Sequence, residues 1–305
     1  MYTVGQQTVK DFRSYLSNWK TVEADGTTSS GKYWYSLVTS QVNADGSFSQ
    51  AAVDNDGGER TYSDYAADGA LKGSAGRCQY VYTPAMVTVP GSLTIGQEWS
   101  GKSVRTCSDD TSENTTVTVK GAVAGLESVT VAAGTFSTIK LSYTRTFAFK
   151  TSTAVIESTC WRDTVTGINV KCENASTTTP NAGGAGYKDT SSIELGGYLQ
   201  ASSGLRKDNI ERFAGKWQTW YSGQENGICD VQIADAGTIS GTCYDNSGYQ
   251  FGINGTVDAR GVATFNLQTG GFAGPVFSGS FESPLKIAGT WSMGSENGTW
   301  YMLHL

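Results

Sequence analysis

Histidine is almost absent from this 305-residue chain, which has only His304, and proline is scarce, with five residues. A Ser-His-Asp triad would have to use that penultimate histidine. No nucleophile elbow, zinc-protease motif, Walker A loop or dinucleotide-binding glycine motif is present. Without C-x-x-C pairs or further histidines, a zinc site is also unsupported. We therefore expect no catalytic residues, no cofactor and no metal site.

Basic clusters and long apolar runs are missing as well. The net charge is −6, and the densest basic group, Arg206-Lys207, adjoins Asp208. Nucleic acids and anionic membrane surfaces both require a basic footprint, so neither is an expected partner. No run of about 18 apolar residues exists, so no transmembrane helix is predicted. Met1 to Gln6 is already polar, and we expect a mature segment with an added methionine.

The residues that are abundant point to β-structure. Glycine is frequent, with 38 residues, and aromatic residues make up 11% of the chain. Glycine turns between short alternating segments are typical of antiparallel sheets. The aromatic content is sufficient for well-packed cores, which argues against disorder. The sequence therefore predicts an all-β protein, long enough for two domains at 1–200 and 201–305.

The six cysteines indicate the compartment. Two pairs flank glycine turns, at Thr166-Gly167 and Ala236-Gly237, and each turn lies at the midpoint of its pair. Cysteines so placed face each other across a hairpin, within reach of a disulfide. Disulfides predict an oxidising compartment; six buried free thiols are the alternative. The predicted pairs are Cys160–Cys172, Cys229–Cys243 and, by elimination, Cys78–Cys107.

The first domain is predicted to be a large, curved antiparallel sheet or half-barrel with one packing helix. The helix is expected over 8–19, where Val9, Phe12, Leu16 and Trp19 have helical spacing. Strands and D-G turns follow from residue 32. The turn at 54–59 has some features of a calcium loop but lacks the closing glutamate, so a plain turn is favoured.

The segment from Leu126 to Phe149 reads as two strands around the turn Ala132-Ala133-Gly134. Its phrase E127-x-V-x-V-x-A-G-T-F136 resembles the E-x-V-x-V-P-A-G-T-F hairpin of bacterial exported proteins and lipoproteins of unknown function, although alanine replaces the usual proline. The passage from Thr83 to Trp99 resembles the same group. The resemblance implies a fold and an extracellular, periplasmic or outer-surface location in a bacterium.

The second domain is expected to follow a Thr- and Ser-rich loop over 174–204 and a short helix over 205–213. Eight strands are predicted at about 215–221, 227–233, 238–244, 249–256, 262–267, 275–281, 286–292 and 298–304, separated by glycine or asparagine turns. This spacing predicts an up-and-down barrel. The phrase ending in Trp217, and the later Gly-x-Trp phrases ending in Trp291 and Trp300, resemble those of lipocalin-like and avidin-like barrels. That resemblance implies that these tryptophans lie at the barrel rim.

These observations favour a non-catalytic secreted or cell-surface protein. Its partner would be an apolar small molecule held in the half-barrel, or a protein surface, including another copy of the chain. Aromatic side chains suit both kinds of binding. A polysaccharide-active enzyme using paired carboxylates is the first alternative. The second is a protease inhibitor that presents residues 200–212 as an extended arm.

Overall fold

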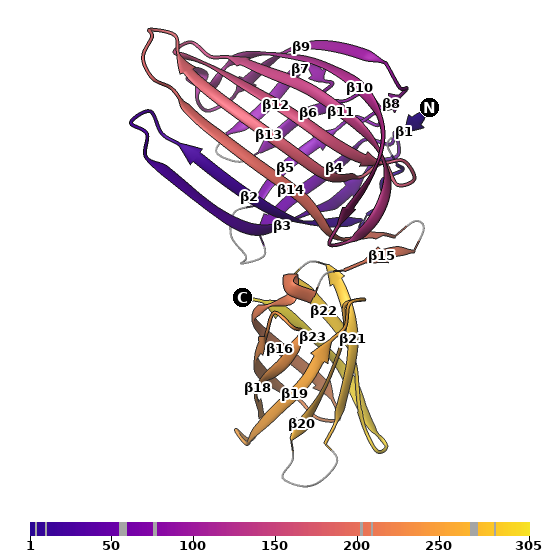
Figure 1. Ribbon diagram of the computed structural model, residues 1–305. Helices are drawn as coiled ribbons and strands as arrows, with labels where there is room; N and C mark the ends of the chain where they lie inside the picture. Colours follow the sequence, from indigo (N-terminus) through magenta and orange to yellow (C-terminus); the bar gives the residue numbers. More distant parts are fainter. Residues whose placement is uncertain are drawn as a thin grey trace.

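The computed structural model describes residues 1–3, 5–9, 11–54, 60–75, 78–201, 204–208, 210–268, 274–283 and 285–305. Across these ranges the chain consists of β-strands, and helical turns are confined to two 3-10 segments, η1 (Thr111–Glu113) and η2 (Ile210–Phe213). The strands form a large and a small barrel, one above the other in Figure 1. The prediction of an all-β protein is confirmed.

The first barrel contains twelve of the described strands, each antiparallel to its neighbours. They are β2 (Phe12–Val22), β3 (Thr28–Val42), β4 (Phe48–Asp54), β5 (Arg60–Tyr65), β6 (Leu71–Ala75), β7 (Gln79–Met86), β9 (Glu98–Cys107), β10 (Thr115–Val131), β11 (Gly134–Ala148), β12 (Ser152–Asp163), β13 (Asn169–Pro180) and β14 (Tyr187–Gln200). Three short strands lie outside the ring. Strand β1 (Tyr2–Thr3) pairs with β8 (Ser92–Leu93), and β15 (Leu205–Lys207) pairs with the end of β14.

The first barrel is closed, so the prediction of an open sheet or half-barrel is wrong. Strand β14 closes it by pairing with β13 on one side and with β2 on the other. Ile193 lies opposite Cys172 of β13 and opposite Ser17 of β2. Closure leaves no free edge in the ring, which removes the tendency of open sheets to pair with other chains.

The helix predicted over 8–19 is also wrong, because residues 12–22 form strand β2. Its apolar spacing has another cause. Tyr15 points into the first barrel, whereas Phe12 points outward and is buried in a cluster with core residues of the second barrel. Because both faces of β2 are covered at this end, the strand loses its simple alternation of apolar and polar residues.

The Thr- and Ser-rich stretch over 174–204 is not a boundary loop, since most of it forms β13 and β14. Its small polar residues are tolerated because β-branched threonine fits a strand. The helix predicted over 205–213 is replaced by β15 and η2. In the turn considered as a calcium loop, residues 55–59 lie outside the described part of the chain.

The predicted hairpin around Gly134 is confirmed, as β10 and β11 pair from Thr116–Ala148 to Val131–Gly134. The glutamate of its sequence phrase has a structural role. Glu127 accepts hydrogen bonds from Trp161 Nε1 at 2.6 Å and from Lys140 Nζ at 3.0 Å. These bonds lower the pKa of the Glu127 carboxyl below its usual value of 4.5. Glu127 therefore ties β10 to β11 and to β12.

The second barrel is closed and up-and-down, as predicted, with eight described strands in sequence order. They are β16 (Gly215–Gly223), β17 (Gly227–Ile233), β18 (Thr238–Asp245), β19 (Gln250–Val257), β20 (Val262–Gln268), β21 (Val276–Ser283), β22 (Lys286–Met293) and β23 (Glu296–His304). Its interior is filled by aromatic side chains. Phe265 stacks on Phe277 with ring centres 4.6 Å apart, and Trp300 meets Phe265 edge to face at 5.0 Å.

Glycines make room for the tryptophans of this core. Trp291 lies opposite Gly298 in the register of β22 and β23, and a Cβ on Gly279 of β21 would come within 2.6 Å of the Trp300 ring. A Cβ atom on Gly298 would come within 2.4 Å of Trp291 Nε1. In the first barrel, Gly121 lies opposite Trp99, and a Cβ there would come within 2.2 Å of its ring. These glycines thus provide space for a cross-strand indole.

The two barrels meet at a buried junction. Arg212 of η2 forms an ion pair with Asp208, and both side chains are 0% exposed. Its guanidinium lies 4.1 Å from the ring centre of Phe213 and 5.6 Å from that of Phe12. Trp217 Nε1 donates a 2.7 Å hydrogen bond to the Phe213 carbonyl. The junction therefore joins the outer face of β2 to the start of the second barrel.

Candidate functional site

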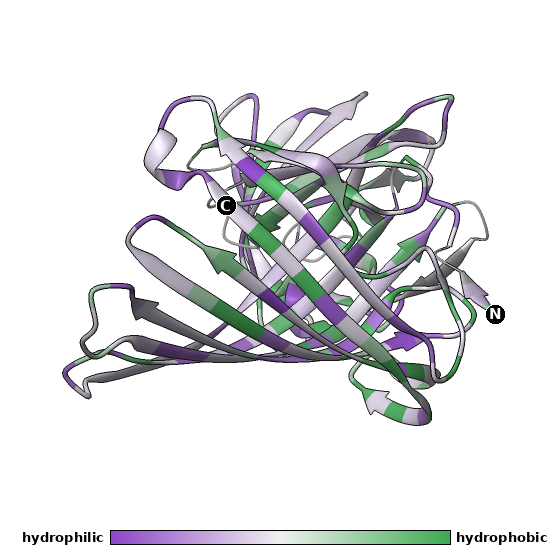
Figure 2. Cartoon of the chain, turned by 90° about the horizontal axis from the view of Figure 1, so that it is seen from above, coloured by the Kyte–Doolittle hydropathy of each residue, from purple (hydrophilic) through white to green (hydrophobic). Residues whose placement is uncertain are grey.

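Alternation along the strands directs every second side chain of the first barrel toward its lumen. On β11 the buried positions Leu141 and Phe147 share this phase with Tyr143 and Arg145, while Ser142 is exposed. The alternation is visible as colour changes along the strands in Figure 2. The lumen-facing set is thus not purely apolar.

A cavity of about 280 Å³ lies in this lumen. Its volume corresponds to roughly nine liquid water molecules, at about 30 Å³ each. Most of the wall is formed by Arg13, Leu37, Phe48, Gln50, Tyr65, Leu71, Met86, Tyr143, Arg145, Arg162 and Asn169, which come from nine strands around the ring. Within the described part of the chain, the lining side chains include three arginines but neither aspartate nor glutamate. The cavity wall is therefore cationic as well as apolar.

Arg162 of β12 is held in a buried position beside the cavity. Burial, with a smaller contribution from the charge of Arg13, lowers its pKa to about 10. Its Nε donates a 3.4 Å hydrogen bond to Asn169 Oδ1, and its buried Nη1 has no hydrogen-bond partner in the part of the chain that the structure describes. A charged group with an unused donor is thus held against the cavity.

Arg13 and Arg145 complete the cationic wall. Arg13 Nη2 donates a 2.8 Å hydrogen bond to Gln7 Oε1. The positive charge of Arg13 stabilises the ionised Asp11 carboxyl. The two oxygens of Asp11, however, accept hydrogen bonds from the backbone N–H groups of Thr8 and Ala201. Arg145 lies 5.9 Å from the ring centre of Tyr143, and its buried Nε has no hydrogen-bond partner among the described residues.

Several buried tyrosines lie near these arginines, and their phenol groups remain neutral hydrogen-bond donors. Tyr15 stacks on Tyr35 at 5.5 Å and donates a 3.1 Å hydrogen bond to the Asn169 carbonyl. Burial raises the pKa of Tyr15, Tyr35 and Tyr65 above the usual value of 10. These phenols therefore stay protonated at neutral pH and do not supply the negative charge that the arginines lack.

A second cavity, of about 500 Å³, lies beside the first at one end of the barrel. Arg105 is one of its charged residues, with its guanidinium 4.2 Å from the ring centre of Tyr80 and 5.3 Å from that of Phe149. In contrast to the inner arginines, Arg105 is paired, with Glu113 Oε2 at 3.2 Å. Phe147, Phe149 and Ile156 form an apolar part of the wall, whereas serine, threonine and charged residues form the rest.

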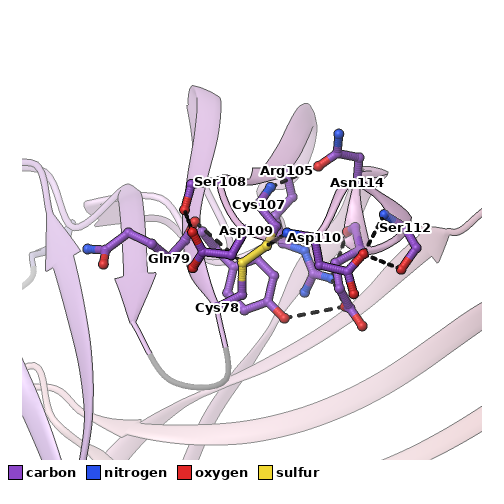
Figure 3. Close-up of a disulfide and its surroundings, with 11 residues drawn as sticks. Cys78, Gln79, Arg105, Cys107, Ser108, Asp109, Asp110, Ser112 and Asn114 are labelled. Carbon is purple, nitrogen blue, oxygen red and sulfur yellow. Dashed lines mark hydrogen bonds and ion pairs between the residues drawn. A yellow bond between two sulfur atoms is a disulfide. The ribbon is translucent and has the colours of Figure 1, made fainter.

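The disulfide Cys78–Cys107 fixes this end of the barrel (Figure 3). The Cys107 backbone N–H donates a 2.8 Å hydrogen bond to Asn114 Oδ1, and the Asp110 N–H lies 3.0 Å from Cys107 Sγ. These contacts hold the loop that carries Glu113 next to Arg105. The disulfide therefore has a positioning role at the mouth of the lumen.

An open groove of about 980 Å³ crosses β9 to β13. Its charged residues Glu98, Lys120, Glu157 and Glu173 are exposed and have the outward phase of their strands. Glu157 lies opposite Ala175, one diagonal step from Glu173. A general acid working near neutral pH requires an apolar surrounding, which these exposed carboxylates lack.

The structure places the predicted residues as follows. All six cysteines are paired as predicted, with Cys160 opposite Cys172 and Cys229 opposite Cys243 in the strand registers. The tryptophans expected at the barrel rim, Trp217, Trp291 and Trp300, all belong to the core of the second barrel. His304 lies edge-on to Trp217 at 4.7 Å, away from the cavities described above.

The sequence reasoning missed the lumen arginines. One signal was available, because Arg145 has the same phase as Leu141 and Phe147 and is thus an arginine where the pattern requires an apolar residue. Arg162 gave a weaker signal, since its phase contains the polar Ser158 as well as Ile156 and Cys160. Among the described residues, no group of three or more potential metal ligands occurs, and no helix there is long and apolar enough to cross a membrane.

Fold and site together define a class: an all-β protein of two antiparallel barrels, the larger with a cationic lumen. No protein-family model and no curated protein matches the sequence. Solved structures similar to the chain include a provisionally assigned exported protein with a YmcC-like fold from Bacteroides fragilis. It is 12% identical, with a TM-score of 0.36, over 64% of this chain and 98% of that one.

Two further solved structures are similar to the chain. A provisionally assigned lipoprotein from Parabacteroides distasonis is 13% identical, with a TM-score of 0.31, over 64% of this chain and 97% of that one. The hypothetical lipoprotein YmcC from Escherichia coli is 13% identical, with a TM-score of 0.32, over 59% of this chain and 86% of that one.

Proposed function

We propose that this is a non-catalytic binding protein that works outside the cytoplasm and holds a small ligand in the lumen of its first barrel. The cavity of about 280 Å³ carries the proposal, because side chains from nine strands wall it. Ligand sites combine apolar walls with a few placed polar groups, as this one does. The three disulfides support the location, since such bonds persist in oxidising compartments.

The ligand is a small molecule rather than a protein surface, because the polar groups that need partners point inward. The second barrel has a different role, because its aromatic core fills the space in which a ligand would bind. It is therefore proposed to be a structural base under the first barrel. A self-associating protein remains a distinct outcome, which the native mass below would reveal.

Native mass spectrometry of freshly isolated protein, followed by titration with the dye ANS, tests the proposal. A bound small molecule, or saturable dye binding, is expected. Leu37→Trp and Val89→Trp, which place a large ring in the cavity wall, should abolish dye binding. Leu126→Trp adds the same ring at an exposed position on β10 and serves as the control.

Three results would contradict the proposal. Equal dye binding by all three tryptophan variants would place the ligand elsewhere. A concentration-dependent oligomer without dye binding would indicate an assembly protein. Hydrolysis of a glycan that is lost in Glu157→Gln or Glu173→Gln would instead identify an enzyme at the outer groove.

A further inference from the structure

The lumen has an unbalanced charge. Arg13, Arg145 and Arg162 all line the cavity of about 280 Å³, and the described residues of that lining include no carboxylate. Removing an ion from water is costly unless an opposite charge or a full set of hydrogen bonds replaces the water. The raised pKa of the neighbouring tyrosines excludes phenolate as the counter-charge. An anion from outside the described chain would balance this wall.

The arginines also have unused donors. A guanidinium has five N–H donors in a planar fork. Within the described ranges, Arg162 Nη1 and Arg145 Nε are buried without a hydrogen-bond partner. The only side-chain hydrogen bond of Arg162 among the described residues is the 3.4 Å contact with Asn169 Oδ1. Paired, planar donors match the oxygens of a carboxylate, phosphate or sulfate.

Apolar side chains share the cavity with the arginines. Leu37, Phe48, Leu71 and Met86 line the same space. Ile156, which lies opposite Arg145 in the β11–β12 register, lines the second cavity together with Phe147 and Phe149. A ligand that filled both regions would need a charged end and a hydrocarbon body.

We infer that the ligand is an anionic amphiphile whose carboxylate, phosphate or sulfate group binds Arg145 and Arg162, with Arg13 beside them. This inference rests on the proposed function, because it assigns the chemistry of the ligand held in the same lumen. The three oxyanions share one recognition chemistry, two or more oxygens facing guanidinium forks.

A series of eight-carbon probes that differ only in the head group tests the inference. Binding of octanoate, octyl phosphate, octanol and octylamine to the full chain would be measured by isothermal titration calorimetry. Octanoate and octyl phosphate should bind about 10-fold to 100-fold more tightly than octanol, the range expected for charge-assisted hydrogen bonds. Octylamine should bind more weakly than octanol. Inorganic phosphate, which lacks the hydrocarbon body, should bind more weakly than octyl phosphate.

The double variant Arg145→Met/Arg162→Met tests whether these two arginines cause the preference for anionic probes. It should lose the preference for anions and bind octanol as the wild type does. Arg260→Met, which removes an exposed arginine on the second barrel, is the control and should behave as the wild type. If the double variant fails to fold, the wild type still decides the question, because octanoate should raise its melting temperature more than octanol does.

The outcomes separate the inference from the function on which it rests. Equal affinity for octanoate and octanol, unchanged in the double variant, would overturn the anion site and leave a lumen carrier. Equal affinity for inorganic phosphate and octyl phosphate would overturn the amphiphile and leave an anion site. If neither ANS nor any probe binds, the proposed function and this inference both fail.

Discussion

Arg212→Met is expected to destabilise the junction between the barrels. The Arg212 and Asp208 side chains are both 0% exposed, so the substitution leaves a carboxylate buried without this partner. Loss of one member of such a pair costs about 3–5 kcal/mol. The guanidinium also lies 4.1 Å from the Phe213 ring centre, a contact of about 0.5–2 kcal/mol. We therefore expect Arg212→Met to lower the free energy of unfolding by roughly 3–5 kcal/mol, a range that includes the lost ring contact.

The double variant Asp208→Leu/Arg212→Met is the critical comparison. Replacing both members of a buried pair by apolar residues is often neutral or stabilising. We expect it to recover most of the stability that Arg212→Met loses. Asp208→Leu alone should be destabilising, because it leaves the guanidinium charge of Arg212 without its carboxylate partner.

Urea unfolding, together with hydrogen exchange of η2 and β16, measures these effects where they should be largest. Arg260→Met is the control, since Arg260 is 82% exposed in its ion pair with Asp258, and an exposed pair contributes about 0–1 kcal/mol. The reasoning about the buried pair is refuted if Arg212→Met lowers the free energy of unfolding no more than Arg260→Met does. It is also refuted if the effects of the Asp208 and Arg212 substitutions add up in the double variant.

Three further predictions concern other parts of the chain. Gly121→Ala should cost about 1–3 kcal/mol, because its Cβ would meet the Trp99 ring. Gly125→Ala on the same strand has no atom within 4 Å of its Cβ and should not lower the melting temperature comparably. Glu127 has a folded pKa below its usual value of 4.5. The advantage of the wild type over Glu127→Gln should therefore be full above that value and vanish as the pH falls through the folded pKa, as pH-dependent denaturation can show. Thiol labelling of the unreduced, denatured protein should find no free cysteine, whereas any labelled cysteine would contradict the three pairings.

The second barrel could be predicted almost strand by strand. The predicted segment at 227–233 has the same bounds as β17, and the remaining bounds differ by at most a few residues. One reason is local, because each short strand there pairs with the next one in the sequence, apart from the closing pair of β16 and β23. Turn residues and alternation within a short window are then sufficient. The same locality allowed the hairpin disulfides to be inferred from the turn positions.

The first barrel could be predicted only in part, because its closure depends on distant pairings. Nothing near Ile193 indicates that it will face Ser17, from which it is far removed in sequence. The error at β2 has a related cause. Phe12 is apolar because the second barrel covers it, and a window of one strand cannot reveal a cover contributed by another domain.

The lumen site was hidden for a third reason. Whether an arginine such as Arg162 faces solvent or a cavity depends on which surface of the sheet becomes the inside. That choice is made only when the sheet closes. Arg145 could be recognised as a charge at an apolar phase, but its proximity to Arg13, on a strand more than a hundred residues earlier, follows from the ring alone.

Strand β14 also determines when the first barrel can exist. It is the last strand of the ring in sequence, and it is the partner of both β2 and β13. A growing chain that has not yet reached Tyr187 therefore has an eleven-stranded sheet with two open edges. Such edges pair readily with other chains. During synthesis, the pairing of β14 with β2 and β13 is therefore the step that we expect to remove both edges and their tendency to aggregate.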